Sequence, residues 1–170
     1  SPFIMPASIP MKNPKVANEL AQYLDDDWKS VIAVDVDGPV PNRIDEENPL
    51  LGSRHVTTRL ARTVFLGSAA RSKNSGIEER FINLGTALPG DKLGNFPSAL
   101  NALANKSSHF YTSESRYWFD TSANITSEVR QREEALSLDN LHEEIEKRLG
   151  VLARNWSRGK SPLLVIPAPR

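Results

Sequence analysis

Apolar side chains recur every three or four residues in four stretches before residue 107, the pattern of helices that bury one face. An Asn-Pro pair opens the first helix, predicted over about 14–24. Ser53 can cap the second helix, whose apolar residues lie on one arc and whose basic residues lie on the other. Two short helices follow, one ending before Pro89 and one starting near Pro97.

Residues that favour strands follow these helices in the stretch "FYTSESRYWF". Two short runs, 110–112 and 116–119, flank a Ser-Glu-Ser turn, which predicts a β-hairpin. The aromatic rings of this cluster have two open roles: packing in a core, or stacking of bases by one or two of them. Packing is favoured, and it predicts that Trp118 is buried while Arg116 is exposed at the turn.

Three helices followed by a hairpin form the order of a winged-helix domain, in which the hairpin is the wing. The predicted fold class is therefore mainly α with a small β component (α+β). We expect an extended lead-in and lid-like helical segment over 1–52 and a winged-helix domain over 53–122. Residues 123–170 are expected to form a helical linker that ends in a strand of a further domain.

Composition narrows the classes of partner. The 21 basic and 21 acidic residues leave no net charge, so no whole-molecule field attracts nucleic acid or a membrane surface. Cysteine is absent, which excludes disulfides and thiolate metal sites, and three scattered histidines predict no metal centre. Apolar runs are far shorter than the ~20 residues of a spanning helix, so we expect a cytoplasmic protein without a membrane partner.

The sharpest chemical motif is "VIAVDVDGP" at 31–39. It resembles the first motif of the haloacid dehalogenase-like phosphatases, which implies a strand ending in a nucleophilic Asp35, with Asp37 as general acid/base beside Mg²⁺. That family also needs a parallel sheet carrying a later Ser/Thr, a Lys and further acidic residues, whereas this chain offers helices and one hairpin. The favoured interpretation is an aspartate-rich turn in which Asp35 and Asp37 cap or bind backbone amides.

Five cations are the candidate contacts for nucleic acid or a partner protein: Arg54, Arg59, Arg62, Lys106 and Arg116. Three lie on the basic arc of the second predicted helix, and Arg116 lies at the wing. The helix before the hairpin, which would enter a DNA groove, offers only Lys106 as a positive charge. Proteins that read the sequence of duplex DNA usually have several Arg or Lys residues on this helix. An interaction module is therefore favoured over a nucleic-acid-binding one.

Short sequence segments in order along nearly the whole chain include "GIEERFINLGTALPG" and "PLLVIPAP", and the most specific are "ARTVFLGSA" and "RYWFDT". These segments resemble a family of large bacterial AAA+-type ATPases, catalogued mainly as a domain of unknown function, with members in anti-phage defence systems. The resemblance implies a fragment that follows an ATPase core, whose partners are the upstream ATPase domain and a downstream domain. Relatives tend to have an Asp-Gly hairpin turn, where this chain has "SES".

The resemblance also implies that ATP and Mg²⁺ belong to the parent protein. The chain contains no G-x-x-x-x-G-K-[ST] loop to cradle phosphates. We therefore expect that it has no cofactor of its own and is not itself an enzyme. Three functions stay open: a domain-interaction module, a nucleic-acid-binding winged helix, and, less favoured, the phosphatase.

Overall fold

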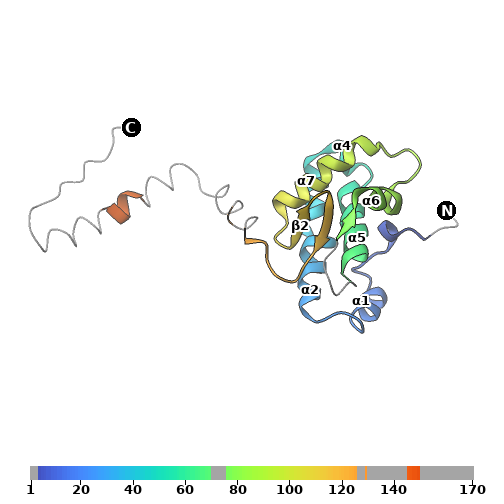
Figure 1. Ribbon diagram of the computed structural model, residues 1–170, viewed down its shortest axis with the longest axis horizontal. Coiled ribbons are helices and arrows are strands. Elements are labelled where there is room, and N and C mark those ends of the chain that lie inside the picture. Colours follow the sequence, from blue (N-terminus) through green and yellow to red (C-terminus); the bar gives the residue numbers. More distant parts are fainter. Residues whose placement is uncertain (1–3, 70–75, 126–128, 130–144, 150–170) are drawn as a thin grey trace, which may run out of the picture. The chain divides into compact units, whose positions relative to one another are not determined.

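The computed structural model describes residues 4–69, 76–125, 129 and 145–149. The chain divides into two compact units, Ser1–Arg130 and Gln131–Arg170. All elements discussed below belong to the first unit, shown in Figure 1. In the second unit, residues 145–149 are helical. Most of the linker expected over 123–170, including its closing strand, lies outside the described residues.

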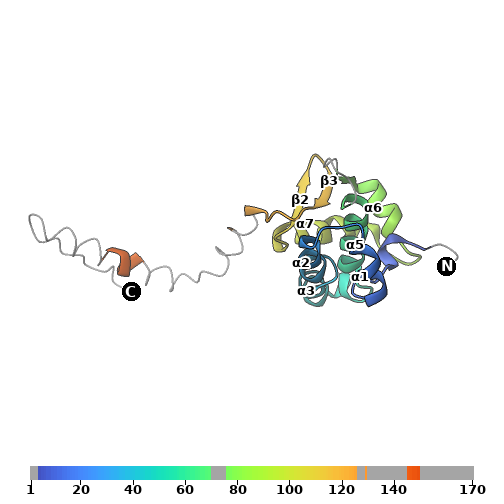
Figure 2. The same cartoon turned by 90° about the horizontal axis from the view of Figure 1, so that it is seen from below.

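The first unit is mainly helical with a small antiparallel sheet of three strands, so the predicted α+β class is confirmed (Figure 2). Its α-helices are α1 (Pro14–Leu20), α2 (Asp27–Val31), α3 (Pro39–Glu47), α4 (Pro49–Gly52), α5 (Val56–Ser68), α6 (Glu79–Thr86) and α7 (Phe96–Lys106). The 3-10 helices are η1 (Pro6–Ser8) and η3 (Leu93–Asn95), and η2 (Ile32–Val36) is a π-helix. The strands are β1 (Ile77–Glu78), β2 (Phe110–Ser113) and β3 (Arg116–Phe119), in the spatial order β1-β3-β2.

The N-terminal third of the chain is more helical than its sequence pattern indicated. The proline-rich start, expected to be extended, instead forms η1, and Ala7 within it is buried. Helix α1 ends at Leu20, four residues earlier than predicted, and a turn follows. Met11, Val31 and Ile44 belong to the same hydrophobic core as residues of α5 and α7. Residues 1–52 and 53–122 are therefore parts of one compact unit.

Helix α5 lies at the centre of this core, with η1, α3, α7 and β3 packed around it. Its apolar arc is buried as predicted, and Leu60, Val64 and Phe65 have almost no exposed surface. Most of its polar arc is buried as well, including Thr57 and Arg59. A helix that is enclosed on both arcs needs protein partners for its polar side chains, because water cannot reach them.

The N-terminus of α5 is capped from a distant segment and not by Ser53 as predicted. Ser53 lies at the C-cap of α4, while the N-cap residue of α5 is His55, whose φ of 49° is left-handed and whose side chain makes no capping bond. Asp45 of α3 takes over this role. Its carboxylate accepts the backbone N–H groups of Thr57 (2.9 Å) and Thr58 (3.2 Å) and the Thr58 hydroxyl (3.0 Å). The negative charge also lies at the positive end of the helix dipole.

The predicted hairpin is confirmed: β2 and β3 pair around the two residues Glu114 and Ser115, which both have positive φ. Positive φ at both central positions is the geometry of a type I′ turn, whose twist suits a hairpin. The expected burial of Trp118 is wrong. Phe119, only 2% exposed, is the β3 residue in the core, where it packs against Phe110 and Phe65.

Trp118 is instead on the opposite face of the hairpin from Phe119, since side chains alternate along a strand. It lies across from Tyr111 in the register, and the two rings stack with centroids 5.6 Å apart and an interplanar angle of 10°. Gly76 allows this close packing: a Cβ there would lie 3.1 Å from the Trp118 ring. The aromatic cluster therefore has a core face and a partly exposed face.

We expect Phe119→Ala to lower the free energy of unfolding by about 3–5 kcal/mol, because it leaves a cavity beside Phe65 and Phe110. Trp118→Ala should cost about 1–2 kcal/mol, since the indole is only partly buried. Urea titration followed by circular dichroism measures both. A larger loss for Trp118→Ala than for Phe119→Ala would contradict this assignment of the two faces.

Asp45→Asn should destabilise the unit by about 2 kcal/mol. The asparagine side chain has one oxygen, which can replace one carboxylate oxygen as acceptor, whereas its NH₂ group would face the other α5 N–H group and repel it. The matched control is Glu46→Gln, which removes an exposed carboxylate next to it in sequence and should leave the urea midpoint nearly unchanged. Equal midpoints for the two variants would show that Asp45 does not cap α5.

Candidate functional site

A polar cleft of about 400 Å³ lies beside the N-terminal half of α5 and brings together four of the seven sequence-predicted site residues: Arg54, Arg59, Arg62 and Asp37. Residues of η1 and α3 line its other side, and Ser8, Asn42 and His55 add polar groups. The remaining predicted residues, Lys106, Arg116 and Asp35, do not line this cleft. The cleft is thus the place where the sequence-derived candidates converge, and the partners of its arginines decide what it can do.

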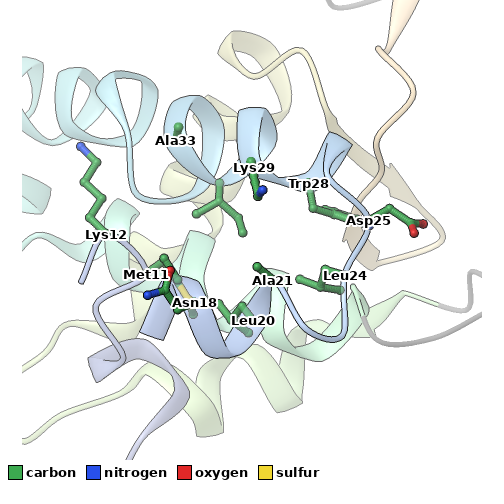
Figure 3. Close-up of a pocket in the computed structure, with 12 residues that line it drawn as sticks. Met11, Lys12, Asn18, Leu20, Ala21, Leu24, Asp25, Trp28, Lys29 and Ala33 are labelled. Atoms are coloured by element: carbon green, nitrogen blue, oxygen red, sulfur yellow. The ribbon is translucent and has the colours of Figure 1, made fainter. Parts of the chain in front are cut away.

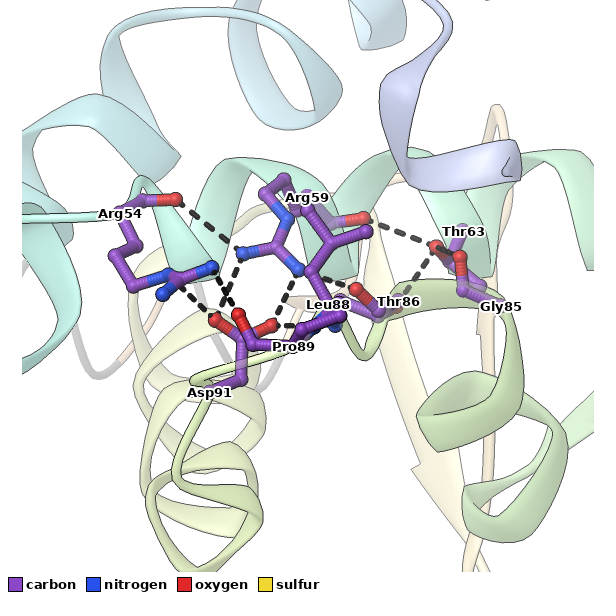
Figure 4. A network of polar contacts seen from close by, with 8 residues as sticks. All are labelled: Arg54, Arg59, Thr63, Gly85, Thr86, Leu88, Pro89 and Asp91. Atoms are coloured by element: carbon purple, nitrogen blue, oxygen red, sulfur yellow. Dashed lines mark hydrogen bonds and ion pairs between the residues drawn. The ribbon is translucent and has the colours of Figure 1, made fainter. Parts of the chain in front are cut away.

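Two of the three arginines share one carboxylate, Asp91, which Figure 4 shows between them. Arg59 donates to both oxygens of Asp91, at 3.3 Å from Nη1 and 2.6 Å from Nη2, and Arg54 Nε lies 2.8 Å from Oδ1. Arg59 also donates to the backbone carbonyl oxygens of Thr86 and Arg54. Arg54 Nη2 donates to the carbonyl of Pro89 at 2.9 Å. Both guanidinium groups are therefore used to hold the loop after α6 against α5.

Asp91 is itself held in place, with a side chain that is 1% exposed. Burial raises the pKa of its carboxyl, but the hydrogen bonds from Arg59 and from the Leu88 N–H, together with the charges of Arg59 and Arg54, outweigh it, so that the pKa lies below its ordinary value. Gly90 makes the loop compatible with this packing, since its φ is 90° and a Cβ there would lie 2.7 Å from Arg54 Nη1.

Arg62 is paired with the second aspartate of the "DVDG" motif. Its Nη2 lies 2.8 Å from Asp37 Oδ1, and its Nη1 donates to the carbonyl of Ala7 at 3.3 Å. The other Asp37 oxygen accepts the backbone N–H of Lys12 at 3.2 Å. Asp37 therefore ties the N-terminal segment to α5.

Asp35, the first aspartate of the motif, binds His109 just before β2. Its Oδ2 accepts the His109 backbone N–H at 3.1 Å and lies 2.7 Å from the ring Nδ1. Both aspartates therefore accept backbone amides, as the favoured interpretation expected, but Asp35 lies within a helix and not in a turn. The strand that the phosphatase resemblance implied is wrong: Asp35 lies in the π-helix η2, directly after α2, and is buried. A nucleophile in that role needs access to a substrate, which this packing does not give it.

The last two predicted cations lie in partly exposed ion pairs, so Arg116 is not fully exposed as expected. Lys106, at the end of α7, pairs with Glu47 at the end of α3. Arg116 Nη2 on β3 lies 2.6 Å from Glu78 Oε1 on the neighbouring β1. About 40% of each cationic side chain is exposed. Both pairs join segments that are close in space but far apart in sequence.

Together the five predicted cations face four carboxylates, those of Asp37, Glu47, Glu78 and Asp91, so the set carries a net charge of about one. Asp37 was singled out in the sequence for another role. The other three carboxylates were not, because they lie 32 to 59 positions from their cations. Within the described residues, no group of three His, Cys, Asp or Glu side chains could hold a metal ion.

Searches against family models, curated proteins and solved structures return no match to this chain. Among the described residues, no helix combines the length and apolarity that crossing a bilayer requires. The resemblance to AAA+-type ATPases therefore stays an expectation, and the geometry of the described residues carries the functional inference below.

Asp91→Asn should lower the free energy of unfolding by about 2 kcal/mol near neutral pH, because it leaves the partly buried Arg59 without its carboxylate. Since the folded-state pKa of Asp91 is below the unfolded value of about 3.9, this stabilisation is present above that pH and is lost as pH falls through the folded pKa. The difference between wild type and Asp91→Asn should thus be constant above about pH 5 and shrink below about pH 4. Urea titrations across pH measure it, with Glu19→Gln at an exposed carboxylate of α1 as control.

Proposed function

We propose that this chain is a winged-helix interaction module of a larger AAA+-type ATPase and that it contacts neighbouring protein domains, not nucleic acid. The order α5-β1-α6-α7-β2-β3, with β3 between the other two strands, supports the winged-helix assignment, since the wing hairpin there also pairs with the strand between the first two helices. The AAA+ parent rests on the resemblance of the sequence.

The observation that carries the proposal is the pairing of every predicted cation with a carboxylate. A phosphate must replace such a carboxylate before it gains a contact, and the cost is highest where the pair is buried, as for Arg59. Non-specific nucleic-acid binding comes almost entirely from such phosphate contacts. Because all five candidate cations are already paired with carboxylates, a protein partner is favoured over nucleic acid.

Helix α7, in the position of a recognition helix, agrees with this choice. The residues on its outer side are Pro97, Ser98, Asn101 and Asn105, which are neutral. Lys106 supplies its one positive charge, and Glu47 already neutralises that charge. A duplex reader would need several Arg or Lys residues on this helix to meet phosphates and guanines.

Helix α6 offers the apolar surface that a protein partner could cover. Phe81 is 50% exposed and Leu84 is 72% exposed, and they lie one turn apart on the outer side of the helix. Arg80 lies over the Phe81 ring at 4.8 Å from its centroid. Exposed aromatic and apolar side chains next to an arginine are typical of contact surfaces between domains.

A nucleic-acid-binding role is the second candidate, because one observation favours it. The Tyr111–Trp118 stack lies on the partly exposed face of the hairpin, and Arg116 is on the same face of β3. Aromatic rings beside a cation can stack unpaired bases without reading their sequence. This candidate function differs from the first because it requires single-stranded nucleic acid and depends on the ring of Trp118.

The experiment that separates the two candidates is a titration of the chain with single- and double-stranded oligonucleotides between about 50 mM and 200 mM salt. We expect no saturable change in oligonucleotide anisotropy at any salt concentration. In the longer parent protein, amide hydrogens of α6 should exchange more slowly than in the chain alone, and Leu84→Ser should remove that protection. Binding that falls steeply with salt, or that Trp118→Ala abolishes without unfolding, would overturn the interaction-module proposal.

A further inference from the structure

Helix α1 is attached to the rest of the unit by apolar contacts alone. None of its residues is buried. Among the described residues, no hydrogen bond or ion pair joins residues 14–24 to a segment distant in the sequence. The side chains of this stretch that pack against the core are Val16, Leu20 and Leu24, and all three are only partly buried. A helix of seven residues is not stable by itself in water, so α1 depends on these three side chains.

The contact between α1 and the core is also incomplete. An open hollow of about 280 Å³ separates α1 and the turn after it from α2. Figure 3 shows Leu20, Ala21 and Leu24 on one side of this hollow and Trp28 on the other. Ala17 lines it as well. Alanine side chains are short, so the dispersion contacts that larger residues would make across the hollow are missing.

The chain is firmly held directly before and after this stretch. On the N-terminal side, Met11 is 1% exposed, and the backbone N–H of Lys12 donates to Asp37 at 3.2 Å. On the C-terminal side, Trp28 packs edge-on against Phe65, with the ring centroids 5.6 Å apart. The stretch that contains α1 thus lies between two anchors on the core. Neither anchor needs a polar bond from α1, so both can persist when the helix leaves.

We propose that residues 13–27 form a lid, which opens by local unfolding of α1 while the core of the unit stays folded. Opening breaks the hydrogen bonds of an exposed helix and three partly buried apolar contacts, and segments held in this way open at low free energy. It uncovers an apolar surface to which Met11, Trp28 and Ile32 contribute. The lid uses no residue of α6, α7 or the hairpin, so it is independent of the interaction-module function.

Native-state hydrogen exchange of the whole chain, followed in ¹H–¹⁵N spectra at several low urea concentrations, measures the opening. The backbone N–H groups of Ala21 and Leu24 donate to carbonyls of the lid, and those of Leu60 and Val64 lie in the buried helix α5. We expect the lid amides to be at least about a hundredfold less protected than the α5 amides. Their exchange should depend little on urea, because a local opening exposes little surface. Equal protection of the two sets, or an equally steep urea dependence, would overturn the proposal.

Ile82→Val tests whether the lid opens without the core. It removes one carbon from a fully buried side chain of α6, which stays folded in the closed and in the open form. The α5 amides should therefore exchange about two- to tenfold faster, while the lid amides keep their rates. Acceleration of both sets by the same factor would show that α1 unfolds only together with the core and would refute the lid.

Leu20→Ala tests what holds the lid closed. It removes one of the three apolar contacts of α1 and leaves the helix propensity nearly unchanged, so the lid amides should exchange about five- to tenfold faster. Lys15→Gln, at an exposed position of α1, is the matched control and should leave the rates of both sets nearly unchanged. Lid amides that exchange in Leu20→Ala as slowly as in the control would contradict the proposed contacts.

Discussion

Helix α5 is buried on its polar arc as well as on its apolar arc, and the unit depends on carboxylates from other segments to make that possible. Asp45 caps its first turn, Asp91 pairs with Arg59, and Asp37 pairs with Arg62. A buried guanidinium or a helix N-terminus without such a partner costs several kcal/mol, a large part of the stability of a small domain. The position of these three aspartates therefore constrains the packing around α5.

Two of these aspartates, Asp37 and Asp45, come from the aspartate-rich segment that also supplies Asp35 to His109. The segment 35–45 thus contacts the N-terminal chain, α5 and the residue before β2 through buried and partly buried polar bonds. These bonds are directional, whereas apolar contacts are not, so they fix how the lead-in lies on the rest of the unit. Asp35 and Asp37 of the motif that most resembled a catalytic one thus join segments that are far apart in the sequence.

Local sequence patterns predicted the elements that depend on local spacing. The apolar period identified α6 and α7, and the β-prone runs identified the hairpin. Which residue is buried, and which side chain caps a helix, depends on segments that are distant in the sequence and could not be predicted from local patterns. Whether Trp118 or Phe119 enters the core depends on which face of the hairpin meets α5, and a shift of one residue exchanges the two faces. Asp45 replaced Ser53 as the cap of α5 because tertiary contact decided which oxygen was near the free N–H groups.

The ion pairs differ in how readily a competing anion could replace the carboxylate, and this difference bears on nucleic-acid binding. Arg59–Asp91 and Arg62–Asp37 are largely buried, so releasing these arginines also releases the loop after α6 or the N-terminal segment. Lys106–Glu47 and Arg116–Glu78 are more exposed, and surface pairs contribute about 0–1 kcal/mol. Arg54, Lys106 and Arg116 are the more exposed of the five cations, with about 40% of each side chain exposed. Three such contacts are fewer than the about 6–10 phosphate contacts of strongly salt-dependent duplex binders. Two of the arginines that suggested a phosphate-binding face in the sequence, Arg59 and Arg62, are thus committed to the interior of the fold.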